Sequence, residues 1–240
     1  MKIEDILICI TNHNSNENAI NLKDGFRDYA ETIIIDSASD LLDDNFDIKL
    51  DNVYYSGLVN ECINQTISRN KKYLFFIASD VYFDNYINIL DIIKEIDDDI
   101  YVWSPSSKGQ SHYHCKNFNT NYYREVPYIE GFCFLSNIEC LKPIYPISLD
   151  KNLYGYGIDL LIGFFCYKLR KKCVVDDRVE IYHKEGTGYN QNKALNDMYN
   201  WMLNDFNNEV KDYTILYSKS WDPTINSSDY KKLLNYLKNG

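Results

Sequence analysis

Short runs of apolar and β-branched residues alternate along the chain with segments whose apolar residues recur every three or four positions. Three such runs are Ile6–Ile10, Thr32–Ile35 and Tyr73–Ile77. An apolar run of this length is typical of a strand that is buried on both faces of a sheet. The segments that follow, including 16–29 and 58–69, have the spacing of helices that bury one face. The pattern predicts an α/β fold with a mixed, mainly parallel sheet between helices.

The rest of the chain continues this alternation. Further strands are predicted at 52–55, 101–104, 126–136, 173–175 and 179–182, and further helices at 160–172, 193–206 and 230–237. Leu41–Asp51 is acidic and is expected to form a loop, and 105–124 is polar and irregular. Asp176–Arg178 predicts a turn between the last two strands.

Composition limits the function classes that remain. A chain of 240 residues has the size of one domain, and its net charge of −10 disfavours a nucleic-acid-binding surface, which needs clustered Lys and Arg. No signal peptide is predicted, because Met1–Asp5 carries two acids and the next apolar run lasts only from Ile6 to Ile10. No stretch approaches the length of a membrane-spanning helix. We expect a soluble cytoplasmic protein, for which peripheral contact with a membrane stays open.

The cysteines and histidines are candidates for metal or disulfide sites. There are seven Cys, none forms a CxxC pair, and most lie inside apolar runs, which favours free thiols in a reducing compartment. His112, His114 and Cys115 stand close together, but their spacing lacks a second ligand pair. A flexible loop near a binding site is therefore favoured over zinc.

Small polar and acidic residues follow the predicted strands. Thr11 and Asn12 end the first strand, Asp36 ends the second, and Ser79 and Asp80 end the strand that begins at Tyr73. Open α/β sheets bind their ligands at the carboxyl ends of their strands. The sequence therefore predicts a ligand site at this edge, with a carboxylate such as Asp36 suited to ribose hydroxyls or a base N–H. Turn residues are the alternative.

The segment Ala78-Ser79-Asp80 resembles the DXD segment of GT-A glycosyltransferases, in particular the broad family 2 group that uses nucleotide-sugar donors. In that family an apolar strand ends in Asp-any-Asp, whose carboxylates hold a divalent metal on the donor diphosphate. Here Ala78 replaces the first Asp. The resemblance implies that Asp80 binds Mn²⁺ or Mg²⁺ and that Ser79 lies beside the donor, whereas a helix-capping or turn aspartate is the alternative.

The resemblance extends to the N-terminal part of the chain. Thr11, with Asn12 beside it, and Asp36 occupy the places that contact the nucleotide in the family. Gly57 and Asn60 stand near the start of the helix that packs beside the nucleotide there. An ordinary helix cap and helix is the alternative for this last pair.

Three later segments also resemble the family. The segment of Glu130 is similar to a Gly-containing strand that crosses beneath the sugar and acceptor in the family, and a buried charge there would be costly unless it were used or paired. The segment Tyr154–Asp159 matches an aromatic-Gly-aromatic-Gly-Glu-Asp pattern that carries the general base of inverting members. Ile158 replaces the Glu, and Asp159 keeps the second acid. His183 ends a strand before a Gly-rich turn and would complete the metal shell or bond a phosphate.

Together these features imply a GT-A fold, Rossmann-like, of the nucleotide-diphospho-sugar transferase kind. The resemblance covers roughly 5–189, which predicts a glycosyltransferase domain at 1–189 and a helical C-terminal extension at 190–240 packed on the same domain. The implied activity is metal-dependent transfer of a hexosyl or N-acetylhexosaminyl unit from a UDP-sugar to an acceptor hydroxyl, with inversion. The acceptor, whether glycan, protein or small molecule, is not indicated.

Two other functions compete with this prediction. A nucleotidyltransferase has a related fold, but its N-terminal turn carries Gly, Arg and Lys, which are absent from Thr11–Asn18. A non-catalytic domain that binds a nucleotide sugar or a partner protein is supported by the degenerate Ala78-Ser79-Asp80 segment.

Overall fold

The computed structural model describes residues 1–41, 44–83, 86–108, 112–184, 189–220 and 227–239. Within these ranges, nine strands form one mixed sheet in the order β3-β2-β1-β4-β8-β6-β9-β5, and β7 pairs with β9 outside this path. The strands are β1 (Ile6–Asn12), β2 (Glu31–Ser37), β3 (Ile48–Leu50), β4 (Tyr73–Ala78), β5 (Val81–Phe83), β6 (Ile100–Lys108), β7 (Tyr123–Glu125), β8 (Cys133–Asn137) and β9 (Lys172–His183).

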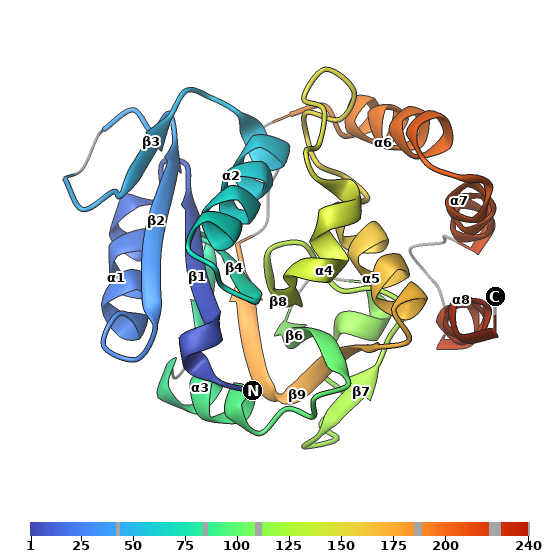
Figure 1. The fold of residues 1–240 in the computed structure, drawn as a ribbon, viewed down its shortest axis with the longest axis horizontal. Helices are drawn as coiled ribbons and strands as arrows, with labels where there is room; N and C mark the ends of the chain where they lie inside the picture. Colours follow the sequence, from blue (N-terminus) through green and yellow to red (C-terminus); the bar gives the residue numbers. More distant parts are fainter. Residues whose placement is uncertain (42–43, 84–85, 109–111, 185–188, 221–226, 240) are drawn as a thin grey trace.

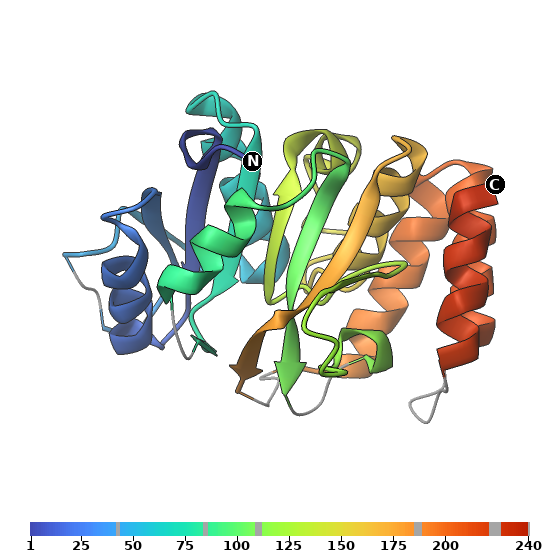
Figure 2. The ribbon, with the colours of Figure 1, turned by 90° about the horizontal axis from the view of Figure 1, so that it is seen from below.

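The helices lie on both faces of the sheet (Figures 1 and 2). They are α1 (Asn16–Phe26), α2 (Tyr54–Ser68), α3 (Tyr86–Lys94), α4 (Ile138–Leu141), α5 (Ile158–Lys168), α6 (Gln191–Asp205), α7 (Asn208–Ser220) and α8 (Ser227–Asn239), with 3-10 turns η1 (Ile3–Asp5), η2 (Tyr113–Cys115) and η3 (Lys142–Ile144). The α/β class and the mixed sheet between helices are as the sequence predicts.

Strand direction decides which residues meet at the functional edge. Strands β3, β2, β1, β4, β6 and β9 point the same way, whereas β8, β5 and β7 run against their neighbours. The carboxyl ends of the parallel strands therefore share one edge with the start of β8. The chain just before Cys133 is brought beside the end of β4.

The core is divided by the sheet into two layers. Strand β4 is buried along Leu74–Ile77, and its side chains alternate between the layers. Leu74 and Phe76 pack with α2, α4 and α5 on one face, and Phe75 and Ile77 pack with α1 and α3 on the other. This is why the run is apolar at every position rather than at every second one.

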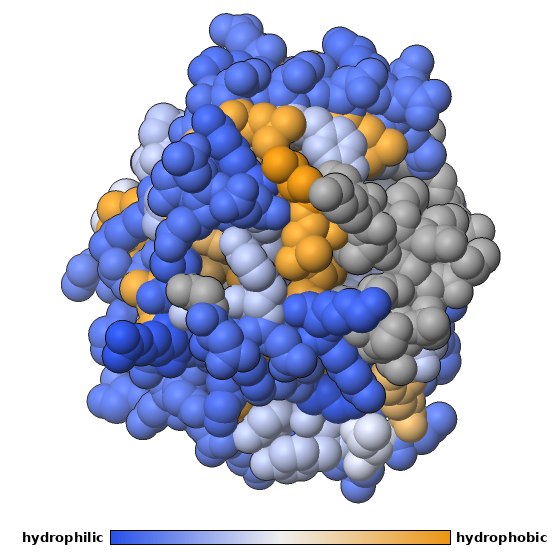
Figure 3. Space-filling view, turned by 90° about the vertical axis from the view of Figure 1, so that its right-hand side faces the viewer, coloured by the Kyte–Doolittle hydropathy of each residue, from blue (hydrophilic) through white to orange (hydrophobic). Residues whose placement is uncertain are grey.

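The C-terminal helices α6, α7 and α8 share the first of these layers. Buried residues on them, such as Met198, Tyr213 and Leu233, belong to the same apolar cluster as α2 and α5. Figure 3 shows this side of the molecule, where a band of hydrophobic residues crosses a mainly hydrophilic surface. Among the described helices, none has the length and apolar character needed to cross a membrane.

The predicted strand at 52–55 is wrong. The third strand is β3, inside the segment expected to be a loop, and α2 begins at Tyr54. Tyr54 takes a left-handed φ of 51°, and Tyr55 packs edge-on against Phe76, with ring centroids 5.4 Å apart. Tertiary packing has overridden the β propensity of these aromatic residues.

Two further boundaries differ from the prediction. Of the expected strand 126–136, only 133–136 is a strand, as part of β8, and the predicted turn at Asp176–Arg178 lies inside the continuous strand β9. The register of β9 against β6 shifts there, from Pro105 paired with Asp176 to Ser106 paired with Glu180. A β-bulge therefore replaces the turn, and it absorbs the polar residues without ending the strand.

The contact between α5 and the chain before β8 is tight enough to test. A Cβ atom added to Gly163 would lie 2.2 Å from the carbonyl oxygen of Pro127 and 2.9 Å from the Cα of Tyr128. We predict that Gly163→Ala lowers the free energy of unfolding by about 1–3 kcal/mol, because backbone must move to admit the methyl group. Urea denaturation measures this loss. Asn64→Ala, at an exposed position of α2, is the control, and equal stabilities for the two variants would refute the tight contact.

Candidate active site

Asp80 and His183 lie side by side at the carboxyl edge of the sheet. Strand β5 pairs with the end of β9 so that Val81 faces His183, and the Lys184 N–H donates to the Asp80 carbonyl oxygen at 3.1 Å. The Nε2 atom of His183 is 3.3 Å from Oδ2 of Asp80, and both side chains are partly exposed. A carboxylate and an imidazole are thus held together where a ligand can reach them.

The turn that carries Asp80 is fixed by its neighbours. The Ser79 N–H donates to the Thr11 carbonyl oxygen at 2.8 Å. The side-chain amide of Asn18 on α1 donates to the carbonyl oxygens of Ser79 and Val81, at 2.7 and 2.9 Å. Asn18 was not predicted from the sequence, because an Asn on a helix face carries no signal of a distant partner.

The chain before β8 joins this pair from the other side. The Ala78 N–H donates to the Phe132 carbonyl oxygen at 2.8 Å, which extends the pairing of β4 with β8. The Phe132 ring stacks on His183, with centroids 4.3 Å apart and planes 8° apart. Phe132 thereby orients the imidazole, a role that the sequence did not indicate.

Two acidic residues, Glu130 and Asp159, lie near Gly131. Oδ2 of Asp159 is 3.8 Å from the point where a Cβ on Gly131 would lie, and Tyr55 donates its hydroxyl proton to the Gly131 carbonyl oxygen. Glu130 accepts the His112 backbone N–H through Oε1 at 2.6 Å. The structure therefore brings the predicted residues Glu130 and Asp159 into one neighbourhood, together with Tyr55 and His112.

The position of Asp159 at the start of α5 follows from the glycines before it. Gly157 precedes the helix with a φ of 83°, a conformation that few other residues adopt. The Leu160 N–H donates to Oδ1 of Asp159 at 2.8 Å. Because the helix N-terminus is positive, it favours the ionised form of this carboxylate.

Burial acts against this helix effect. Part of Asp159 reaches solvent, but desolvation raises the pKa of its carboxyl group from 3.8 to about 6. Among the smaller effects, the charge of Glu130 raises this pKa, whereas His112 and the Leu160 N–H lower it. The net shift of the Asp159 pKa is therefore upward, which is opposite to the effect of the helix N-terminus. At pH 7 the carboxylate still carries its charge and has a higher affinity for a proton than an exposed Asp.

The predicted nucleotide residues at β1 and β2 form a closed hydrogen-bond cluster. Asp36 is fully buried, and it accepts from the Asn12 side-chain amide at 2.7 Å and from the Ser39 hydroxyl and N–H at 2.5 and 3.0 Å. Thr11, Asn12 and Ser79 are also buried at this edge. In this arrangement Asp36 organises the turn after β2, so its carboxylate orders the loop rather than facing solvent.

The predicted residues on α2, Asn60 and Gly57, contact other parts of the chain. The Asn60 side chain holds both backbone groups of Ile147, donating to its carbonyl oxygen and accepting from its N–H, each at 2.8 Å. Gly57 is buried against Val53, where an added Cβ would clash. These two residues support the loop beside α2 and the entry to that helix.

The donor set at Asp80 and His183 fits a divalent metal that is shared with a substrate. Among the described residues, no cluster of three or more His, Cys, Asp or Glu is placed to hold an ion. Mg²⁺ and similar ions bind through one or two protein ligands when substrate phosphates supply others. The zinc alternative has no such support, because Nε2 of His114 bonds the Tyr128 carbonyl oxygen at 2.8 Å and Cys115 is buried.

Comparisons with known proteins place this geometry in a known fold. No protein-family profile and no curated protein sequence matches the chain. The structure of GalNAc-T7 with UDP, GalNAc and Mn²⁺ superimposes with a TM-score of 0.59 at 12% identity, over 98% of this chain and 55% of that one. The chain has the GT-A fold. Because the superposition covers 55% of the GalNAc-T7 structure, this chain spans about half of that protein's length.

Two other solved structures are similar in the same way. The mannosyltransferase PcManGT from Pyrobaculum calidifontis, in complex with GDP-Man and Mn²⁺, gives a TM-score of 0.60 at 12% identity, over 99% of this chain and 70% of that one. S. aureus TarS 1–349 gives 0.58 at 14% identity, over 98% and 70%. The predicted GT-A fold is confirmed, with identities too low to carry specificity.

The raised pKa of Asp159 gives a stability test. Because the folded chain holds this proton more tightly than the unfolded chain, protonation favours folding. The stabilisation is present below about pH 4 and is lost as the pH rises to about 6. We predict that Asp159→Asn gains roughly 1–3 kcal/mol relative to wild type across this window. Urea denaturation at several pH values measures the difference, and a pH-independent difference would contradict the shift.

Proposed function

We propose that this chain is a metal-dependent glycosyltransferase that moves a sugar from a nucleoside-diphosphate donor, UDP-linked, to an acceptor hydroxyl. The observation that carries the proposal is the meeting of two polar pairs at one edge of a GT-A sheet. Asp80 with His183 forms one pair, and Glu130 with Asp159 forms the other. The first suits a charged leaving group, and the second suits proton transfer.

Asp80 and His183 are the residues that would hold Mn²⁺ or Mg²⁺. When bound, such an ion supplies positive charge that stabilises a leaving diphosphate. The protein's own contribution is to fix the two ligands, through the β5–β9 ladder and the Phe132 stack. The crowded turn around Thr11, Asn12, Asp36 and Ser79 would form the nucleotide end of the site.

Asp159 is the proposed general base. Its pKa of about 6 leaves it ionised at neutral pH while keeping a useful proton affinity. It would accept the proton of the acceptor hydroxyl as the oxygen attacks the anomeric carbon from the side opposite the diphosphate, which inverts that centre. Glu130 would raise the proton affinity of Asp159 by its charge, and it is the alternative base.

The metal assignment has a direct test. We predict that Asp80→Ala abolishes the increase in UDP affinity that Mn²⁺ causes in wild type, because the variant loses the only carboxylate of the pair. Isothermal titration calorimetry with and without Mn²⁺ measures this increase. Asp28→Ala, at an exposed position after α1, is the matched control. An undiminished Mn²⁺ effect in Asp80→Ala would remove Asp80 from the metal site.

The base assignment has a separate test. We predict that Asp159→Asn lowers the rate of sugar transfer by about 10²–10⁴-fold while UDP and Mn²⁺ still bind, because Asn cannot accept the proton. In wild type, the rate should rise with pH through about 6 as the carboxylate ionises. Asp28→Asn is the control. A rate within a few-fold of wild type would shift the base to Glu130 or favour retention.

A non-catalytic binding domain would give a different result. It would bind UDP-sugar, with or without Mn²⁺, but release no UDP over time. Hydrolysis or transfer of the donor by wild type, lost in Asp80→Ala, therefore separates the enzyme from the binding domain.

A further inference from the structure

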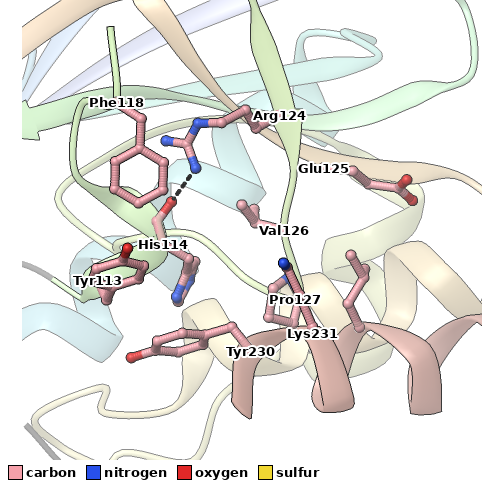
Figure 4. A pocket seen from close by; sticks show the side chains of 10 residues that line it. Tyr113, His114, Phe118, Arg124, Glu125, Val126, Pro127, Tyr230 and Lys231 are labelled. Atoms are coloured by element: carbon pink, nitrogen blue, oxygen red, sulfur yellow. Dashed lines mark hydrogen bonds between the residues drawn. The ribbon is translucent and has the colours of Figure 1, made fainter. Parts of the chain in front are cut away.

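A pocket of about 210 Å³ lies between η2, β7 and α8. Figure 4 shows its lining: aromatic side chains gather at the η2 end, and charged side chains stand along β7 and α8. No residue of the two polar pairs described above lines it. The pocket is therefore a separate feature, and the acid and metal pairs do not account for it.

The η2 end of the pocket offers aromatic faces. Tyr113 and Phe118 are each more than a third exposed, with ring centroids 5.1 Å apart, and Tyr230 lies parallel to Tyr113 at 6.5 Å. Val126 and Pro127 add apolar surface between them and α8. Faces of this kind favour a flat ligand that has an apolar side.

Polar groups surround these faces. Lys231 is exposed and forms no ion pair with a described residue, so its three N–H groups can donate to a ligand. Glu125 accepts from Lys238 and has acceptor capacity left. Both donors and acceptors are thus present, and a ligand hydroxyl group can use both.

The pocket is built in advance of any ligand. The Arg124 guanidinium stacks on Phe118 at 4.2 Å and donates to the carbonyl oxygens of His114 and Lys116 at 3.1 and 2.7 Å. It also pairs at 2.9 Å with Asp177, whose side chain is fully buried. This clamp fixes the η2 turn and the rings it carries, which lowers the cost of ordering them on binding.

The η2 turn also connects the pocket to the acidic pair. His112 donates its backbone N–H to Glu130, and its ring stacks on that of His114 with centroids 5.8 Å apart. His112 also lowers the pKa of Asp159 by an electrostatic interaction. One turn of chain therefore has Glu130 and Asp159 on one side and the pocket on the other.

We propose that this pocket is a subsite for a glycosyl unit of an extended acceptor, the unit next to or near the one that receives the sugar. Tyr113 and Phe118 would stack on the apolar face of the sugar ring, and Lys231 and Glu125 would bond its hydroxyls. The inference rests on the proposed glycosyl transfer, because that function places the acceptor hydroxyl at Asp159. It narrows the acceptor to a carbohydrate longer than one unit.

The test uses the full chain and defined probes. Saturation-transfer difference NMR would record binding of the methyl β-glycosides of glucose, galactose and N-acetylglucosamine and of their β-linked disaccharides, with UDP and Mn²⁺ present. We predict that wild type binds at least one disaccharide more tightly than its monosaccharide. Tyr113→Ala should weaken that disaccharide by roughly three- to tenfold. Tyr29→Ala, which removes an exposed tyrosine that does not line the pocket, should leave the disaccharide affinity unchanged.

Two measurements keep this test separate from that of the proposed function. Circular dichroism checks that Tyr113→Ala is folded, and Lys231→Met, at an exposed position, provides a second variant that should weaken the same disaccharide. UDP binding with Mn²⁺ is recorded for every variant. Disaccharide binding without UDP binding would reject the proposed glycosyl transfer and leave the pocket as a carbohydrate-binding site, whereas UDP binding without disaccharide binding would reject the subsite and keep the donor site.

Two further results would overturn the subsite. One is disaccharide binding that Tyr113→Ala and Lys231→Met leave at the wild-type level. The other is binding of N-acetylphenylalaninamide, a mimic of a peptide side chain, that depends on Tyr113 when no glycoside binds. That second result would assign the pocket to a peptide.

Discussion

The antiparallel pairing of β8 with β4 is the constraint on which the candidate site depends. It reverses the chain direction inside an otherwise parallel half of the sheet, and the Ala78 N–H closes it by donating to the Phe132 carbonyl oxygen. Phe132 is thereby placed beside the end of β4, where its ring stacks on His183, the partner of Asp80, and Glu130 stands two residues earlier in the chain. Without this reversal, the start of β8 would lie at the opposite edge, and the two polar pairs could not meet.

The electrostatics of this edge of the sheet result from acidic residues that lie close together in a chain with a net negative charge. Asp159 is enclosed near Glu130, and the energetic cost of burying its charge raises its pKa. The compensating groups are local: backbone N–H donors at Leu160 and His112, and an imidazole beside Asp80. In the proposed function, such a region would bind a cation and supply a carboxylate as the base, which are the two properties that transfer from a diphosphate donor needs.

The buried carboxylate of Asp177 has a different role. Asp177 pairs with Arg124 and accepts from Thr120 and Phe118, so it holds the 112–120 segment rather than taking part in chemistry. Helix α8 packs against this segment through Tyr230, which contacts His114. The pocket thus depends on two parts of the chain that are far apart in sequence. For this reason, no local sequence pattern predicts the pocket.

The sequence alone determined the layer architecture, because a strand buried on both faces, such as β4, must be apolar at every position. It also predicted the positions of three candidate residues in the fold: Asp80 shortly after a strand, Asp159 in the first turn of a helix after glycines, and His183 at the end of a strand. It failed at 52–55 and 176–178, where aromatic packing and a bulge decided the backbone. Tertiary structure alone decided that Asp36 is enclosed, that Asn60 binds Ile147, and that Tyr55, Phe132 and His112 join the site. These outcomes depend on contacts between distant segments, and local propensity carries no record of such partners.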